Sequence, residues 1–232
     1  MADALHGMRD SGDLKVNSKD RRNQAIQYAL DRLYMARISI HRLIAHHKSL
    51  YCPEERKINT MLQGTIESKC DPTRIAEEAY ENAAFLCDQI YLDHPKLNII
   101  TTNTVDDGAA KDTVNFVYIP SHLYHMFFEV FKNSMRATME YHEDAETIPE
   151  IDVHIVKGVE DITIKVSDRG GGLRRCEMGN VFLYLYTSVT ERVKLSGGDM
   201  GGTTSSNTPM HGLGYGLPLS RLYARYGFAS RY

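Results

Sequence analysis

Apolar residues recur every three or four positions between Gln24 and Tyr51, the spacing of one face of an α-helix. The repeating positions are Ile26, Leu30, Leu33, Ile40, Leu43 and Ile44. Pro53 should end this helix, because proline cannot continue a helical backbone. Residues 52–71 then form a connection with a possible short strand. A second helix is predicted to open at Asp71-Pro72-Thr73 and to be bounded by Pro95, because its apolar positions show the same period.

Strict alternation of apolar and polar residues follows in the second half of the chain. Ile151–Val156 and Ile162–Ser167 alternate on either side of a turn, which predicts an antiparallel hairpin with one buried face. Further expected elements are strands at Leu97–Thr102 and Thr113–Tyr118 flanking the turn 106–108, helical structure at 179–187, a long loop at 188–211, and a helix from Leu217 to Tyr226.

The segment His125–Thr138 predicts a helix with two incompatible faces. Its polar residues His125, Glu129, Lys132, Asn133 and Arg136 are spaced by four, three, one and three positions, so they share one side of the helix. The rest of the segment is too apolar for a helix that lies on the outside, which favours a polar stripe that lines a cleft. Ser121 is the expected N-cap of this helix. A carboxylate one turn from a carboxamide, beside cations, suits acid–base and metal–phosphate chemistry; the alternative is an interdomain network of ion pairs.

Composition narrows the class of protein only a little. The 232 residues are 42% hydrophobic and 25% charged, with a formal net charge of -3 and no basic block, so nothing points to nucleic acid. No apolar run approaches the roughly 18 residues of a membrane span. The four cysteines form no CxxC pair, and no presequence is visible at the N-terminus.

Two glycine-rich motifs follow the polar-striped helix. Gly212-Leu213-Gly214-Tyr215-Gly216 opens the last predicted helix, and such a turn is a ready phosphate site, although glycines also simply turn the chain. It matches neither the dinucleotide-binding fingerprint nor a P-loop. Asp168 ends the hairpin before Arg169-Gly170-Gly171-Gly172. Asp168 is either a turn residue or a carboxylate that accepts the amine of adenine.

The order Glu-x-x-x-Asn, Asp-x-Gly-x-Gly, Gly-x-Gly-x-Gly resembles the N-box, G1 and G2 motifs of the GHKL ATPase and kinase superfamily. Within it, HLYHMFFEVFKNSMRAT, VSDRGGG and GLGYGLPLSRLYARY are similar to the mitochondrial 2-oxoacid dehydrogenase kinases, and most of all to the pyruvate dehydrogenase kinases. LDRLYMARISIHRLIAHH resembles the last long bundle helix of that family. The resemblance covers roughly residues 24 to 226. A histidine kinase proper is disfavoured, because no acidic residue follows His41, His46 or His47.

The resemblance implies a role for each matching residue. Glu129 is the expected general base, oriented by His125, while Lys132 and Arg136 neutralise phosphate charge. Asn133 is the expected Mg²⁺ ligand. Asp168 is expected to read adenine. The remaining expected ATP contacts are Gly170, Gly172, Thr187, Ser188, Gly212, Leu213, Gly214, Tyr215, Gly216 and Leu217. Thr187-Ser188 stands where the family shows Ser-Thr, and residues 189–211 are expected to form the ATP lid.

The resemblance also implies fold, partners and compartment. The expected fold is α+β, with part of a four-helix bundle over residues 1–92 and a GHKL ATP-binding sandwich with a mixed, mainly antiparallel sheet over 93–232. The expected activity is phosphorylation of serine on the E1 alpha subunit of the pyruvate dehydrogenase complex, inhibiting the complex and so regulating pyruvate oxidation in the mitochondrial matrix. Docking to the lipoyl domain of E2 and a homodimer are family properties.

Two alternatives stay open. Met210-His211 favours the branched-chain 2-oxoacid dehydrogenase kinase, whereas Ser121–Met126 favours the pyruvate enzyme. The family shows further helices before Gln24 and further strands after Tyr226, so the sequence is expected to be truncated at both ends. The second alternative is therefore a noncatalytic fragment that binds nucleotide or partner subunits.

Overall fold

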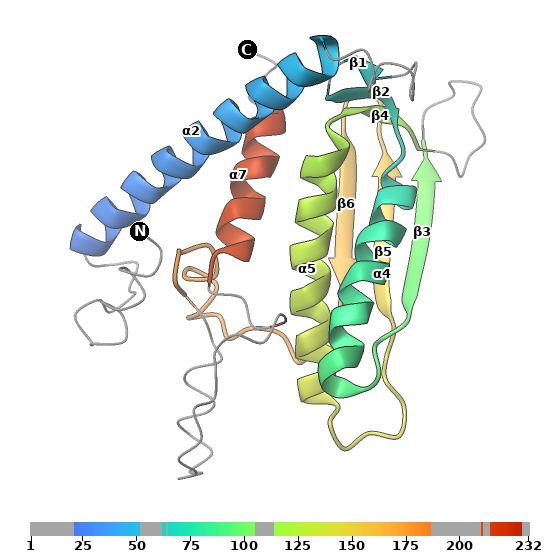
Figure 1. Cartoon of the computed structure of the whole chain (residues 1–232). Coiled ribbons are helices and arrows are strands. Elements are labelled where there is room, and N and C mark those ends of the chain that lie inside the picture. Colours follow the sequence, from blue (N-terminus) through green and yellow to red (C-terminus); the bar gives the residue numbers. More distant parts are fainter. Residues whose placement is uncertain are drawn as a thin grey trace.

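The computed structural model describes residues 21–51, 62–63, 65–104, 114–186, 210 and 214–228. It has the expected α+β composition, with long helices and two small sheets (Figure 1). The elements are α2 (Arg21–Tyr51), β1 (Leu62–Gln63), β2 (Ile66–Cys70), α4 (Pro72–Tyr91), β3 (Leu97–Asn103), β4 (Phe116–Tyr118), α5 (Pro120–Tyr141), β5 (Ile151–Lys157), β6 (Ile162–Ser167) and α7 (Gly216–Phe228). None of these described helices is both long and apolar enough to cross a membrane.

The larger sheet has the strand order β3-β5-β6. Strand β5 pairs antiparallel with β6, which confirms the predicted hairpin, and parallel with β3. The sheet is therefore mixed, as expected. Strand β4 is shorter than predicted and pairs with β2 in a separate antiparallel sheet. The two strands predicted on either side of the turn 106–108 thus belong to different sheets, and the turn itself lies outside the described residues.

Helices α4 and α5 lie side by side over one face of the β3-β5-β6 sheet (Figure 1). Small residues on α4, among them Ala76, Ala79 and Ala83, let the two helices approach closely. Phe131 of α5 and Val153 of β5 are fully buried in the same core. This packing fixes one face of α5 to the sheet and leaves its polar face free to line a cleft.

Helix α4 begins as predicted, with Asp71 as N-cap: Asp71 Oδ1 accepts a hydrogen bond of 2.9 Å from the amide of Thr73, and Pro72 follows in the first turn. The expected cap of α5 was wrong. The N-cap is Ile119, without a side-chain hydrogen bond, and Ser121 lies inside the first turn. Pro120 starts this helix instead, because its fixed φ is already helical.

The helix predicted at 179–187 was also wrong for the residues described. Residues 180–186 form two successive four-residue turns. Leu183 N donates a hydrogen bond to Asn180 O, and Tyr186 N donates one to Leu183 O. Leu185 has a φ of 67°, which an α-helix cannot contain. The described part of this segment, residues 179–186, is therefore a series of turns and not an α-helix.

Helix α2 runs over the whole predicted span, but its apolar stripe is only partly covered. Leu30 is buried at 2% exposure, whereas Ile40, Leu43 and Ile44 are more than half exposed. The buried side of α2 faces α7 and the turns that end at Tyr186. Polar residues take part in that contact.

Candidate functional site

Three residues of the polar stripe of α5, Glu129, Asn133 and Arg136, line a cleft of about 310 Å³. The chain after β6 and the start of α7 form its other sides. The predicted site residues that meet there are Glu129, Asn133, Arg136, Asp168, Gly170, Gly172, Gly214, Gly216 and Leu217. Sequence reasoning missed Val181, Leu173, Tyr186 and Pro218, which also line the cleft. Nothing in their local sequence distinguishes them, because only the fold brings them to α5.

Glu129 is the best-anchored polar group of the cleft. Its Oε1 lies 2.9 Å from Lys132 Nζ, and the two side chains are only 14% and 11% exposed. The ammonium also lies 5.0 Å from the centre of the Phe128 ring. On the other side, a Cβ added to Gly216 would fall on Oε2 of Glu129. The carboxylate is thus held between a lysine and the first residue of α7, and only glycine leaves room for it.

His125 stands one helical turn before Glu129, between α5 and α7. Its ring centre lies 4.8 Å from that of Tyr223. Burial lowers the pKa of His125, the nearby Glu129 acts in the opposite direction, and Lys132 adds to the lowering. The net effect keeps the imidazole neutral near pH 7. A neutral imidazole can accept or donate a proton beside the carboxylate.

His122 was not singled out from the sequence, although it precedes His125 by three positions and shares its helix face. Burial, then Arg42 and His125, lower the pKa of His122 to about 4. Its ring packs 4.6 Å from that of Tyr223, so one tyrosine of α7 contacts both imidazoles. The H-x-x-H spacing was the signal that could have found it.

Asn133 and Arg136 complete the stripe along the cleft wall. Arg136 Nε lies 3.7 Å from Glu140 Oε1, in an ion pair along α5. The described residues hold no cluster of three or more His, Cys, Asp or Glu that could bind a metal by itself. The stripe does offer two hard oxygen donors to the cleft, the carboxamide of Asn133 and the carboxylate of Glu129.

Asp168 follows β6 and makes the turn that the simpler interpretation required: its Oδ1 accepts a hydrogen bond of 3.0 Å from the amide of Gly170. Gly170 is buried against the α5 backbone, because an added Cβ would lie 2.5 Å from Ala137 Cβ and 2.7 Å from its carbonyl carbon. Gly172 has a φ of 69° and open space around it. The carboxylate keeps its second oxygen for other partners.

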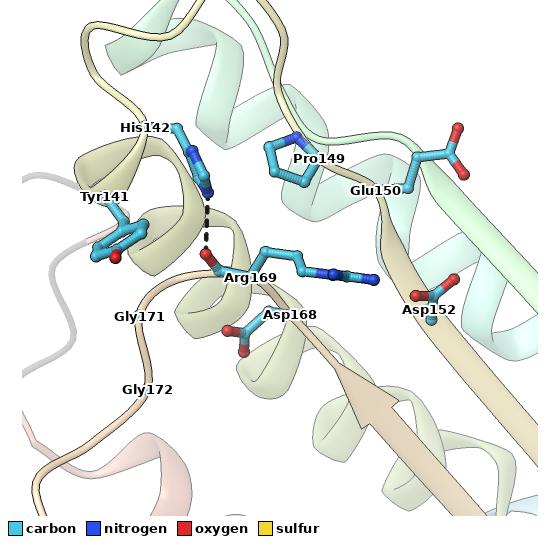
Figure 2. Close-up of a pocket in the computed structure, with 9 residues that line it drawn as sticks. All are labelled: Tyr141, His142, Pro149, Glu150, Asp152, Asp168, Arg169, Gly171 and Gly172. Atoms are coloured by element: carbon cyan, nitrogen blue, oxygen red, sulfur yellow. Dashed lines mark hydrogen bonds between the residues drawn. The ribbon is translucent and has the colours of Figure 1, made fainter.

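A second, more open hollow lies beyond this turn (Figure 2). It shares Asp168 and Gly172 with the cleft, and its far side carries Glu150 and Asp152 at the start of β5. His142 Nε2 lies 3.0 Å from the carbonyl oxygen of Arg169, which ties the end of α5 to the turn after β6. Asp168 therefore stands at the point where the two hollows meet.

The remaining predicted residues divide into two groups. Thr187, Ser188, Gly212 and Leu213 lie outside the described residues. Tyr215 is described, but its ring packs against Tyr34 and Tyr184, away from the cleft lining. His125 and Lys132 do not line the cleft directly and contact residues around Glu129 instead.

The chain is similar in sequence to several known proteins. No protein-family model matches it. It is 44% identical over 205 residues, or 88% of the chain, to pyruvate dehydrogenase (acetyl-transferring) kinase isozyme 1, mitochondrial, of Mus musculus. It is 43% identical over 87% of the chain to the mitochondrial pyruvate dehydrogenase kinase of Drosophila melanogaster, and 41% identical over its full length to that of Ascaris suum.

The matches cover 44%, 47% and 54% of these three relatives, so the chain spans about half the length of the curated relatives it matches. These relatives are all named as kinases of pyruvate dehydrogenase. The class of protein to which the matched residues belong is therefore the protein kinases. The predicted resemblance is confirmed: over the matched residues, the chain belongs to the family of mitochondrial pyruvate dehydrogenase kinases.

Proposed function

We propose that this chain carries the nucleotide-binding core of a Mg-ATP-dependent protein kinase that phosphorylates serine on the E1 alpha subunit of the pyruvate dehydrogenase complex. The observation that supports this proposal is the arrangement of the cleft. Glu129 and Asn133 lie on one helix face opposite Gly214 and Gly216, and Asp168 lies farther along the same cleft. In this proposal the base, the metal ligand, the phosphate loop and the adenine acceptor thus all line a single cleft.

In this proposal the start of α7 holds the phosphates of ATP, because the first amides of a helix and its dipole favour an anion. Asp168 accepts the exocyclic amine of adenine. Asn133 would hold a magnesium ion, which would supply positive charge against the charge of the transferred phosphoryl group. Arg136, along the same wall, adds a fixed positive charge.

Glu129 takes the proton from the substrate hydroxyl as its oxygen attacks the γ-phosphorus. The paired Lys132 ammonium, 2.9 Å from Glu129 Oε1, holds the carboxylate in position. His125, one helical turn away and neutral, is the group proposed to orient Glu129. The bond from the γ-phosphorus to the bridging oxygen breaks as the new one forms, so the products are phosphoserine and ADP. The proton stays on Glu129 until it passes to solvent.

The partners belong to the proposal as well. E1 alpha supplies the serine, the lipoyl domain of E2 brings kinase and substrate together, and a second copy of the chain completes a homodimer in the mitochondrial matrix. The relatives carry the names of kinases of pyruvate dehydrogenase, which supports this substrate over a branched-chain 2-oxoacid dehydrogenase. A fragment that binds nucleotide without transferring phosphate would show the binding result below and no phosphorylation of E1 alpha.

Mg-ADP should raise the melting temperature of the chain. At about 100 times the dissociation constant a ligand stabilises by about 2.7 kcal/mol, which is about 5–10 °C for a chain of this size. Removing Mg²⁺ with EDTA, or the substitution Asn133→Ala, should abolish most of the shift. Asn82→Ala, at an exposed position of α4, is the matched control and should keep it. A wild-type chain that melts at one temperature with and without Mg-ADP would contradict nucleotide binding.

Gly216→Ala should reduce phosphoryl transfer about 10²-fold with little loss of stability. The new methyl group would occupy the position of Glu129 Oε2, and a carboxylate at the end of a side chain can move away. A base displaced by about 1 Å loses its alignment with the attacking hydroxyl. The check is the rate of E1 alpha phosphorylation beside a denaturation curve. Unchanged transfer by this variant would show that Glu129 does not act from its position against Gly216.

A further inference from the structure

One face of α2 pairs with the backbone of Tyr184, which lies in the turns that lead to the cleft wall. Tyr184 N donates a hydrogen bond of 2.7 Å to Gln27 Oε1, and Gln27 Nε2 donates one of 3.3 Å to Tyr184 O. The carboxamide of Gln27 thus occupies the place of a neighbouring strand. Without it these backbone groups would lose both partners at a fully buried residue.

One helical turn farther along α2, Asp31 binds the side chain of the same residue. The phenol of Tyr184 donates a hydrogen bond of 2.8 Å to Asp31 Oδ1. Burial and this hydrogen bond raise the pKa of the phenol well above its usual range. Leu30 packs between these two polar contacts and is 2% exposed. Backbone and side chain of Tyr184 are therefore both fixed by α2.

The same stretch of α2 also contacts α7 and the residues that open it. Arg221 Nη2 lies 3.6 Å from Asp31 Oδ1. The ring of Tyr34 lies 5.4 Å from that of Tyr184 and 5.9 Å from that of Tyr215. The cleft wall opposite α5 is built from two segments that are far apart in the sequence, the turns that end at Tyr186 and the start of α7. Helix α2 contacts both segments.

These two sides are joined directly beside the cleft. Leu185 N donates a hydrogen bond of 3.0 Å to Gly214 O. The next residue on one side, Tyr186, and Gly214 with Gly216 on the other line the cleft opposite the α5 stripe. Any movement of Tyr184 would be transmitted through a single residue to the cleft lining.

We propose that Gln27, Asp31 and Tyr184 form a clamp through which α2 positions the cleft wall formed by Tyr186, Gly214 and Gly216, so that they are positioning residues for nucleotide binding. The proposal rests on the proposed function, because it assigns the cleft to a nucleotide. Nothing in it requires α2 to touch the ligand. The charge of Asp31 serves two partners on different segments, which couples the turn and α7 in one contact.

The test uses Gln27→Ala, which removes both bonds to the Tyr184 backbone, and Tyr184→Phe, which removes only the phenol bond. Gln89→Ala, at an exposed position of α4, and Tyr51→Phe, at the exposed end of α2, are the matched controls. Mg-ADP affinity is measured by calorimetry. Amide hydrogen exchange of residues 184–186 and 214–215 is measured without nucleotide, beside a denaturation curve.

We expect Gln27→Ala to weaken Mg-ADP binding about ten-fold and Tyr184→Phe about five-fold. The first variant loses two hydrogen bonds to Tyr184, besides the one of 3.3 Å that Gln27 Nε2 donates to Asn23 Oδ1, and the second loses one. Exchange at 184–186 and 214–215 should accelerate in both variants, and the two controls should match the wild type in every readout. Faster exchange with unchanged affinity would overturn the positioning role, and so would unchanged exchange. If the wild-type chain does not bind Mg-ADP, the proposed function fails and this inference with it, while the exchange difference would still report the clamp as a purely structural contact.

Discussion

Glu129→Gln should lower phosphoryl transfer to E1 alpha about 10³-fold while Mg-ADP affinity changes little. The amide keeps the shape of the carboxylate but cannot take the proton of the attacking hydroxyl, and general-base catalysis contributes about 10²–10⁴-fold. The fall should appear in kcat rather than in the binding of nucleotide, because Glu129 acts on the acceptor side of the reaction. Single-turnover transfer from labelled ATP, with lipoyl-bearing E2 supplied, measures it.

Glu77→Gln provides the matched control for this variant, since Glu77 is exposed on α4 and faces away from the cleft. It should transfer phosphate at the wild-type rate. Equal rates for Glu129→Gln and the wild type would remove Glu129 from the mechanism. Loss of Mg-ADP binding in Glu129→Gln would instead assign Glu129 to the architecture of the cleft.

Gly170→Ala should destabilise the fold by about 3 kcal/mol, at the upper end for an overpacked core position. The added methyl would lie 2.5 Å from Ala137 Cβ and 2.7 Å from a backbone carbon of α5, and a helix backbone cannot yield as a side-chain tip can. The turn after β6 must then move away from α5 and take Asp168 with it. Urea denaturation should show the loss, and Mg-ADP affinity should fall in the same variant.

Gly179→Ala is the control for that substitution. No atom lies within 4 Å of an added Cβ at Gly179, and its φ is not in the left-handed region. Its stability should match the wild type or exceed it slightly, because alanine restricts the unfolded chain. If Gly170→Ala were as stable as Gly179→Ala, the close packing of the turn against α5 would be wrong.

The sequence predicted best those features that are encoded within a few neighbouring residues. The period of apolar positions located α2 and α4, and alternation located the β5–β6 hairpin. The polar stripe located the middle of α5, and the glycine motif followed by Pro218 located α7. The polar stripe of α5 was sufficient to predict a cleft there. The rest of the helix is too apolar to be exposed, so its five polar side chains were expected to line a cleft rather than the outer surface. Pro72 with Asp71 gave the start of α4 for the same local reason.

Errors arose where a distant segment decides the outcome. A helix was predicted at 179–187, but the backbone of Tyr184 bonds to Gln27 of α2 instead of continuing a helix. Leu185 has a positive φ and donates a hydrogen bond to Gly214. Strand β4 pairs with β2 and not with β3, and no local signal in the sequence distinguishes these two partners. The side of α2 that faces the rest of the fold carries Gln27 and Asp31, and both bind Tyr184, which lies more than 150 positions away in the sequence.

The sequence by itself therefore determined the family and the three motifs, and it predicted which residues would carry their chemistry. The tertiary structure alone decided that Glu129 is pinned between Lys132 and Gly216, that Gly170 sets the distance from the turn to α5, and that α2 touches the wall of the cleft. The physical reason is that a residue type fixes what a group can do, whereas burial and contact across the chain fix where it stands and which charges surround it.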